Sequence, residues 1–199
     1  MTDKPFQAPE TVIMVRPASF GFNQETAESN SFQQQDPDIN PEQIQASALR
    51  EFDKFAAKLR KAGVDVIVFE DKLEPHTPDA IFPNNWVSFH QDGKVILYPM
   101  NAPSRRKERR GEFITALQKE FDFNVDEIID ISYFEKKEQF LEGTGSIVFD
   151  YVNKIAYANL SSRTDRTILD YVSTILDYEV FVFEAVDAQG KDIYHTNVV

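Results

Sequence analysis

The chain has 199 residues, of which 42% are hydrophobic and 17 are phenylalanine, enough to bury the core of one domain or of two small ones. Its formal net charge of -12 argues against nucleic acid or an anionic membrane surface as a partner, because both bind positively charged surfaces. It contains no cysteine, which excludes disulfides, thiolate metal sites and a cysteine nucleophile within these residues.

The first ten residues are polar and hold no apolar signal-peptide core. Elsewhere too, no stretch is long and apolar enough for a membrane span. We therefore expect a cytoplasmic protein. The first apolar run, Thr11–Val15, is rich in β-branched residues and is closed by Arg16-Pro17, so it predicts a strand.

Residues 18–40 form a long polar stretch rich in Asn, Gln and Ser. We interpret it as a functional loop, because Phe20, Phe22 and Phe32 are unusual in disordered segments. Pro41 then stands where a helix begins, and apolar residues at near-helical spacing predict a helix that ends near Gly63. Residues 64–69 predict the next strand.

Two later stretches follow one plan of strand, turn, strand, helix and strand. The first predicts strands over 86–90, 94–98 and 127–131, with a helix over about 104–121. The second predicts strands over 146–150, 154–159 and 179–183, with a helix over about 164–176. Lys94 matches Lys154, and Ser104-Arg105 matches Ser162-Arg163 at the helix start, which gives a period of roughly 60 residues.

This repeat divides the sequence into units over residues 11–70, 84–131 and 145–184, of which the first is a looser copy. Residues 191–199 read as a strand that opens a fourth unit. Units of this kind cannot each close their own sheet, and a terminal apolar strand leaves an unpaired edge. We therefore expect one α/β domain over 1–199 that is C-terminally truncated or is completed by another chain. The second case leaves open that the protein is a homo-oligomer.

The stretch Asp79–Trp86 places two adjacent amides, Asn84 and Asn85, between a Phe82-Pro83 step and an apolar run. Buried amides need partners on both their donor and acceptor edges, which makes such a pair costly unless something uses it. The same residue types are typical of a turn. By itself, this stretch leaves a turn and a site open.

Four arginines crowd the predicted start of a helix, where the macrodipole disfavours cations: Arg105, Arg106, Arg109 and Arg110. We expect the last three to form a solvated face that pairs with Glu108 and Glu112. Arg105 differs because Arg163 recurs in the repeat, which leaves open that it binds an anion such as a substrate carboxylate.

Two further polar residues stand beside apolar runs. Glu142 lies between Leu141 and Gly143 just before a strand, where flanking glycines let backbone or ligand approach closely. His195 lies at the start of the last apolar run, where a buried polar side chain needs a partner. We expect the other histidines, His76 and His90, at the surface.

Five motifs appear in the order in which the guanidine-modifying enzymes carry them, at residues 79–85, 102–106, 141–143, 160–164 and 195–197. No single motif is specific, but five in register over nearly the whole chain resemble this superfamily of pentein, or five-bladed α/β-propeller, enzymes. Its members include dimethylargininase, arginine deiminase and the amidinotransferases. The resemblance implies a pentein-type α/β-propeller, of which this chain would hold three of five units and the start of a fourth.

Within that superfamily the sequence looks like the bacterial citrulline hydrolases, on residues 16–17, 20–23, 82–86, 98–100 and 194–197. The resemblance implies a role for each site residue. His195 would be the general acid and base, Glu142 the carboxylate that orients the reacting group, and Arg105 and Arg163 the clamps on the amino acid ends. Phe82 would form a wall of the pocket and Asp79 would contact the substrate. The nucleophile would be a cysteine on the last blade, which this chain lacks, so these residues alone should be inactive. No metal or cofactor is implied.

The chain departs from the guanidine pattern at two positions. Asn85, with Asn84 beside it, stands where relatives that act on arginine-like substrates have an acid, and Asn197 stands where several have Asp. An amide can satisfy both the carbonyl and the N–H groups of a neutral ureido group, whereas a carboxylate would repel the carbonyl oxygen. We therefore expect hydrolysis of citrulline to ornithine, carbon dioxide and ammonia. Two alternatives stay open: a guanidino substrate on the same fold, and a non-catalytic ligand-binding or interaction module.

Overall fold

A computed structural model describes residues 7–27, 29–30, 33–34, 38 and 40–199; the prediction made at Phe32 lies outside them. The chain falls into two compact units. The N-terminal unit comprises residues 8–83 and 102–110, and the β-repeat unit comprises Gln7 with residues 84–101 and 111–199. None of the helices in the described part of the chain has the length and apolar character needed to cross a membrane.

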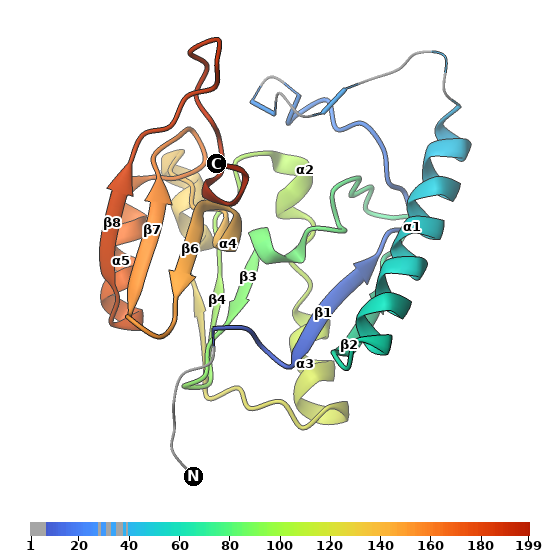
Figure 1. Ribbon diagram of the computed structural model, residues 1–199, viewed down its shortest axis with the longest axis horizontal. Coiled ribbons are helices and arrows are strands. Elements are labelled where there is room, and N and C mark those ends of the chain that lie inside the picture. The colour runs from blue at the N-terminus through green and yellow to red at the C-terminus, as the bar shows by residue number, and fades with distance from the viewer. Residues whose placement is uncertain (1–6, 28, 31–32, 35–37, 39) are drawn as a thin grey trace. The chain divides into compact units, whose positions relative to one another are not determined.

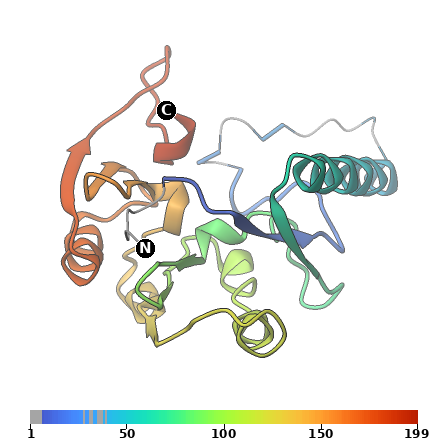
Figure 2. The same ribbon diagram turned by 60° about the horizontal axis from the view of Figure 1, so that its bottom comes forward.

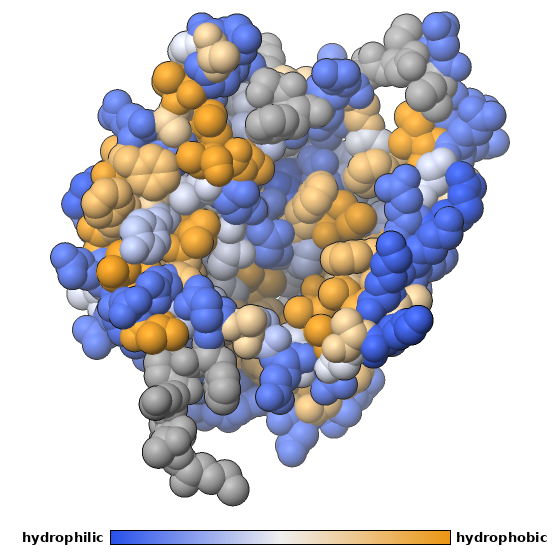
Figure 3. Space-filling model, in the orientation of Figure 1, coloured by the Kyte–Doolittle hydropathy of each residue, from blue (hydrophilic) through white to orange (hydrophobic). Residues whose placement is uncertain are grey.

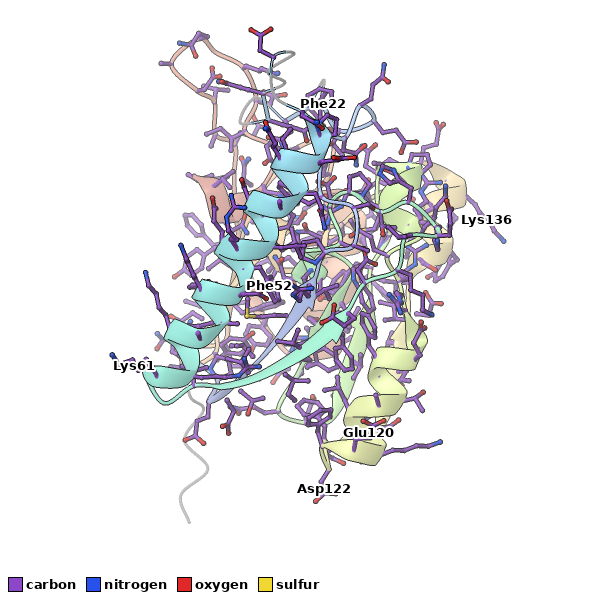
Figure 4. All side chains as sticks on the ribbon, turned by 90° about the vertical axis from the view of Figure 1, so that its right-hand side faces the viewer. Phe22, Phe52, Lys61, Glu120, Asp122 and Lys136 are labelled. Atoms are coloured by element: carbon purple, nitrogen blue, oxygen red, sulfur yellow. The ribbon has the colours of Figure 1, made fainter. Side chains whose placement is uncertain are left out.

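The N-terminal unit is built from strand β1 (Thr11–Arg16), helix α1 (Pro41–Lys61) and strand β2 (Asp65–Glu70). β1 and β2 pair in parallel, as strands joined by a helix do. The side chain of Asn40 caps α1 by accepting the Glu42 N–H at 2.8 Å. Figure 4 labels Phe52 in the middle of α1, where its side chain is buried, and Lys61 at the helix end.

The β-repeat unit contains two copies of the order strand, strand, helix and strand (Figures 1 and 2). The first has strands β3 (Val87–Phe89), β4 (Lys94–Leu97) and β5 (Glu127–Asp130), with α3 (Gly111–Glu120) before β5. The second has β6 (Ile147–Asp150), β7 (Ile155–Asn159) and β8 (Glu179–Phe183), with α5 (Arg166–Leu176) before β8. In each copy the first two strands pair antiparallel and the last two pair in parallel. Both copies have the order of strands and helices that the sequence predicts. β1, α1 and β2 match the last three elements of that order.

The core cluster of the β-repeat unit includes buried residues of α5 and of the second sheet, together with Ile96 of β4. Ile168, Leu169 and Val172 of α5 are fully buried in one cluster with Ala156 and Ala158 of β7. Small strand residues let the helix approach the sheet closely. The opposite face of this sheet carries a row of side chains in which Val148 and Phe181 are exposed and Tyr157 is partly exposed. In Figure 3, orange apolar patches lie among blue ones on the side of the molecule that holds this sheet.

Two predicted elements are wrong. The helix expected over 104–121 is two helices, α2 (Pro103–Arg106) and α3, because the chain leaves the helical path at Lys107 and a buried Arg105–Glu108 pair occupies the break. As a result Arg105 lies inside α2, whereas Arg163 lies in a turn before α5. The strand expected over 191–199 is a loop with one bridge, between Asp192 and Val186, that ends in a 3-10 turn, η3 (Thr196–Val198).

The fold class is mixed α/β, as expected. Three short helices complete it: η1 (Pro83–Asn85), η2 (Ser132–Lys137) and α4 (Gly143–Ser146). The strands form three separate open sheets of two, three and three strands within the described residues. η1 contains Asn84 and Asn85, and α4 directly follows Glu142, so both short helices carry or adjoin predicted site residues.

Candidate active site

A fully buried carboxylate, Glu142, lies at the centre of the β-repeat unit, directly before α4. Its Oε2 is 2.8 Å from His195 Nε2 and 3.4 Å from Arg163 Nη1. Its Oε1 accepts the backbone N–H of Asn101 at 3.1 Å. Three donors on one buried carboxylate offset its loss of hydration, so Glu142 is held in a single orientation.

Side-chain hydrogen bonds to backbone hold the loop that carries His195. Thr196 Oγ1 accepts the N–H of Asn159 at 2.8 Å, and Asn159 Nδ2 donates in turn to the carbonyl of Ile193. Ser161 Oγ donates to the Tyr194 carbonyl at 2.7 Å. The loop is therefore fastened to the end of β7, and this fastening replaces the strand that the sequence predicted.

Arg163 is oriented by the same loop. Its guanidinium carbon lies 4.5 Å from the centre of the Tyr194 ring, a cation–π contact, and its side chain is 4% exposed. Its carbonyl accepts from Ser146 Oγ at 2.8 Å and from the Glu142 N–H at 3.2 Å. Backbone and side chain of Arg163 thus both contact the segment that carries Glu142.

Two glycines bring Asn85 against this centre. A Cβ atom on Gly145 would lie 2.3 Å from Asn85 Nδ2 and 2.8 Å from His195 Nδ1, so the amide and the imidazole meet at a position that tolerates no side chain. Gly143 has φ +47, and a Cβ there would lie 2.2 Å from the Asn84 carbonyl oxygen. Asn85 is 4% exposed, and its Nδ2 donates to the Glu142 carbonyl at 3.5 Å.

The other two predicted amides are placed differently. Asn84 contacts the glycine segment through its backbone, since its carbonyl accepts from Thr144 Oγ1 at 3.4 Å. Asn197 is exposed in η3. Within the described residues, neither side chain makes a hydrogen bond. The structure therefore joins Asn85, Glu142, Arg163 and His195, and leaves the side chains of Asn84 and Asn197 apart from them.

The remaining predicted residues form a second cluster in the N-terminal unit. Arg105 is 3% exposed, and its Nε and Nη2 each donate to a Glu108 oxygen at 3.0 Å. Nη2 also donates to the Phe82 carbonyl at 3.3 Å, and Nε lies 3.8 Å from Asp79 Oδ2. The Phe82 side chain is itself exposed. The structure thus brings together Asp79, Phe82 and Arg105. Glu108 accepts hydrogen bonds from two of the arginine's N–H groups.

This pairing corrects the expectation of a solvated basic face. Glu108 is buried and pairs with Arg105. Arg110 Nη1 lies 3.5 Å from Asp71 Oδ1, and the Arg110 side chain is 13% exposed. The sequence pattern of alternating charges does not distinguish such partly buried pairs from solvated ones.

Asn23 is the main residue missed by sequence reasoning. It is 4% exposed, and its Nδ2 donates to Asp79 Oδ2 at 2.7 Å and lies 3.1 Å from Ser104 Oγ. The only sequence signal was its place in the run 20–23, within a loop already interpreted as functional. Thr196 and Asn159 were missed for the same reason: a polar residue beside a strand gives no local sign of its distant partner.

His90 is half-buried, so its expected surface position is wrong, whereas His76 is exposed as predicted. His90 Nε2 is 2.7 Å from Ser88 Oγ, which is 2.8 Å from the Tyr98 hydroxyl. Burial lowers the pKa of His90 to about 4 and raises that of Tyr98. Within the described residues, no group of three or more histidine or acidic side chains is arranged to hold a metal ion.

Comparisons with known proteins agree with these motifs. A family model for N,N dimethylarginine dimethylhydrolase, eukaryotic, matches residues 16–199. No curated protein sequence matches significantly. Among solved structures, a cysteine-to-serine variant of the N-terminal domain of ArgZ, an arginine dihydrolase from cyanobacteria, bound to substrate, has a TM-score of 0.66 and 17% identity. The match covers 92% of this chain and 60% of that one.

Two dimethylarginine dimethylaminohydrolases share the fold as well. A cysteine-to-serine variant from Pseudomonas aeruginosa, complexed with citrulline, has a TM-score of 0.60 and 20% identity, over 88% of this chain and 62% of that one. A histidine-to-glycine variant, as an adduct with S-methyl-L-thiocitrulline, has a TM-score of 0.61 and 19% identity. That match covers 92% of this chain and 63% of the other one. The chain thus spans 60 to 63% of the length of these relatives. With a family match over residues 16–199 and a shared fold, the chain belongs to the N,N dimethylarginine dimethylhydrolase family of the guanidine-modifying, or pentein, superfamily.

Proposed function

We propose that the protein carrying this chain hydrolyses a C–N bond of a ureido or guanidino amino acid, and that its substrate is citrulline. One observation carries the proposal: the buried pair of His195 and Glu142, 2.8 Å apart, meets the neutral amide of Asn85 at Gly145. The complexes of relatives with citrulline and with a thiocitrulline adduct support this class of ligand.

We propose the α/β-propeller architecture for the whole protein. Two copies with the same strand order, and a third segment that matches their last three elements, support it. Each copy would form one blade. The chain would hold three of five blades and the start of a fourth. The single-domain organisation over 1–199 and the truncation stay predictions. So do the cytoplasmic location, the homo-oligomer and the absence of a cofactor.

The proposed chemistry is covalent. A cysteine thiolate attacks the ureido carbon, the bond to the ornithine nitrogen breaks, and His195 gives that nitrogen a proton. Water then hydrolyses the S-carbamoyl group to carbamic acid, which decomposes to carbon dioxide and ammonia and frees the thiolate. The chain has no cysteine, so the nucleophile must come from residues outside these 199. Cysteine-to-serine variants of two relatives, captured with substrate and with citrulline, support a cysteine in this role.

The contacts of the two ring nitrogens of His195 support a separate role for each. Its Nε2 faces Glu142 Oε2, so Nδ1 is the nitrogen left on the side of Gly145 and Asn85. A carboxylate on one ring nitrogen orients the imidazole and stabilises the imidazolium that forms when the other nitrogen takes a proton. We therefore assign proton transfer to Nδ1. Arg163 shares Glu142 and holds it in place.

Asn85 would select a neutral head group, since its amide has both a donor and an acceptor to offer. Of the remaining predicted contacts, Arg163 fits a clamp on the amino acid. A ligand carboxylate at Arg105 would share the guanidinium with Glu108. The exposed ring of Phe82 is available to pack on a ligand, and Asn84 and Asn197 would have to turn their side chains toward it.

The test is to incubate the complete protein with L-citrulline and to assay ornithine. We expect turnover, and we expect Asn85→Asp to lower kcat/KM for citrulline about a hundredfold, because a buried carboxylate would face the ureido oxygen. Asn153→Asp, the same change in a surface turn, is the matched control. Unchanged citrulline turnover by Asn85→Asp would refute the role of the amide.

A guanidino substrate is the second candidate, favoured by the dimethylarginine name of the matching family and by the arginine dihydrolase among the relatives. The same assay with L-arginine and N,N-dimethylarginine separates the two. Turnover of either without ornithine from citrulline rejects the citrulline assignment. Binding of an amino acid by the complete protein without any turnover would favour the non-catalytic module.

A further inference from the structure

We infer that Asn23 is a positioning residue that aims the Asp79 carboxylate at an N–H group of the amino acid substrate. The inference rests on the proposed function. It starts from a buried contact: Asn23 is 4% exposed, and its Nδ2 donates to Asp79 Oδ2 at 2.7 Å. An amide buried this deeply needs a use for both of its ends.

Both ends of the Asn23 amide have partners. Oδ1 accepts the backbone N–H of Glu25 at 3.1 Å, so the NH₂ group must face the other way, toward Asp79 and the Ser104 hydroxyl at 3.1 Å. The Asn23 carbonyl accepts from Gln33 Nε2 at 3.0 Å and from Thr26 Oγ1 at 3.1 Å. Backbone and amide are held at the same time, which lets Asn23 set the orientation of a neighbour.

This neighbour, Asp79, can accept a further hydrogen bond. Asp79 Oδ2 receives Asn23 and lies 3.8 Å from Arg105 Nε. Across the described residues, no donor lies within hydrogen-bond distance of its Oδ1, although the Asp79 side chain is only 13% exposed. A carboxylate oxygen that solvent still reaches, on a side chain that is otherwise mostly buried, and that has no protein donor fits an N–H donor from a ligand.

The surrounding charges leave Asp79 available to such a donor. Arg105 gives its two short hydrogen bonds to Glu108, at 3.0 Å each, and not to Asp79. Glu25 is engaged with the Ser104 N–H, which lowers its pKa. Asn23 holds Asp79 without neutralising it, because an amide donates a hydrogen bond but carries no charge. A lysine here would hold the carboxylate equally well and cancel its attraction for a substrate N–H.

Exchanging the side chains of Asn23 and Asp79 tests whether Asn23 positions the Asp79 carboxylate or only stabilises the fold. Asp79→Asn removes the charge, Asn23→Asp adds a second carboxylate beside it, and the double variant Asn23→Asp/Asp79→Asn restores one amide and one carboxylate in exchanged places. We expect the double variant to regain most of the thermal stability lost by Asn23→Asp. We expect its KM to stay raised roughly tenfold, because the carboxylate then points away from the ligand.

The pH dependence of KM supplies a second readout. Two carboxylates in contact share a proton, so Asn23→Asp should bind substrate worse as the pH rises from about 6 to 8, a trend that wild type lacks. Gln33→Ala, which removes one hydrogen bond to the Asn23 carbonyl and leaves Asp79 untouched, is the control and should lower stability without this trend.

The outcomes are distinguishable. Three results would overturn the inference while wild type still turns over substrate. They are a wild-type KM in the double variant, an unchanged KM for Asp79→Asn, and the same KM at pH 6 and pH 8 for Asn23→Asp. A wild type that turns over neither L-citrulline nor L-arginine overturns the proposed function, and this inference with it.

Discussion

At the scale of single residues, the centre of the β-repeat unit depends on the absence of a side chain as much as on those present. His195, Asn85 and Glu142 approach one another because the segment 143–145 has glycine at both ends. Glycine lets two polar side chains converge where any Cβ would separate them. The site geometry is therefore sensitive to one methyl group.

Gly145→Ala tests this directly on the 199-residue chain. The new Cβ would lie 2.3 Å from Asn85 Nδ2 and 2.8 Å from the imidazole, so we expect the free energy of unfolding to fall by about 2 kcal/mol. Urea denaturation measures it. Gly111→Ala is the matched control, because nothing lies within 4 Å of its Cβ and it begins α3. Equal stability of the two variants would contradict the packing described here.

At the scale of elements, the two repeated sheets differ in how their helices begin. α5 is capped by Asp165, whose Oδ1 accepts the N–H of Thr167 at 2.8 Å and of Ile168 at 3.2 Å, whereas α3 begins at Gly111. A cap with two bonds contributes to helix stability because the first N–H groups have no partner in the helix.

We expect Asp165→Ala to lower the free energy of unfolding by about 1 kcal/mol, with an upper range of about 2 kcal/mol, since both bonds are lost. Asp170→Ala, which removes the exposed pair with Arg166, should cost less than about 0.5 kcal/mol. Thermal denaturation of both variants compares them. A larger loss in Asp170→Ala would show that the cap is not what stabilises α5.

The β3–β4 hairpin carries a titratable group that should affect stability in acid. Burial lowers the pKa of His90 from 6.5 to about 4, with smaller effects from Asp92, Lys154 and Lys94. Because the unfolded chain binds the proton more readily, stability is full above pH 6.5 and is lost as the pH falls toward 4, by at most about 3 kcal/mol.

His90→Gln should flatten this part of the stability profile, whereas His76→Gln, an exposed histidine, should leave it unchanged. Urea denaturation at pH 4.5, 5.5 and 7 measures the difference from wild type. The same acid loss in His90→Gln would mean that other groups cause it.

At the scale of the whole molecule, apolar patterning predicted the order of strands and helices in both copies of the β-repeat unit, and it predicted the strand, helix and strand of the N-terminal unit. The five motifs together predicted a family that the match over residues 16–199 confirms. The stretch Asp79–Trp86 spans the division between the two units, so its residues belong to two clusters. Asp79 and Phe82 lie with Arg105, and Asn85 lies with His195.

The sequence by itself determined where most of the strands and helices form, because burial of alternating or helically spaced apolar residues is a local property. It also determined that no thiol is present in these residues. Only the tertiary structure decided which polar groups meet: the side chains of Asn23 and Asp79, the Thr196 hydroxyl and the Asn159 backbone N–H, and the side chains of Glu108 and Arg105. The same kind of contact turned residues 191–199 into a fastened loop instead of a strand. Hydrogen bonds between segments dozens of residues apart outweigh local strand preference, and no local pattern in the chain records them.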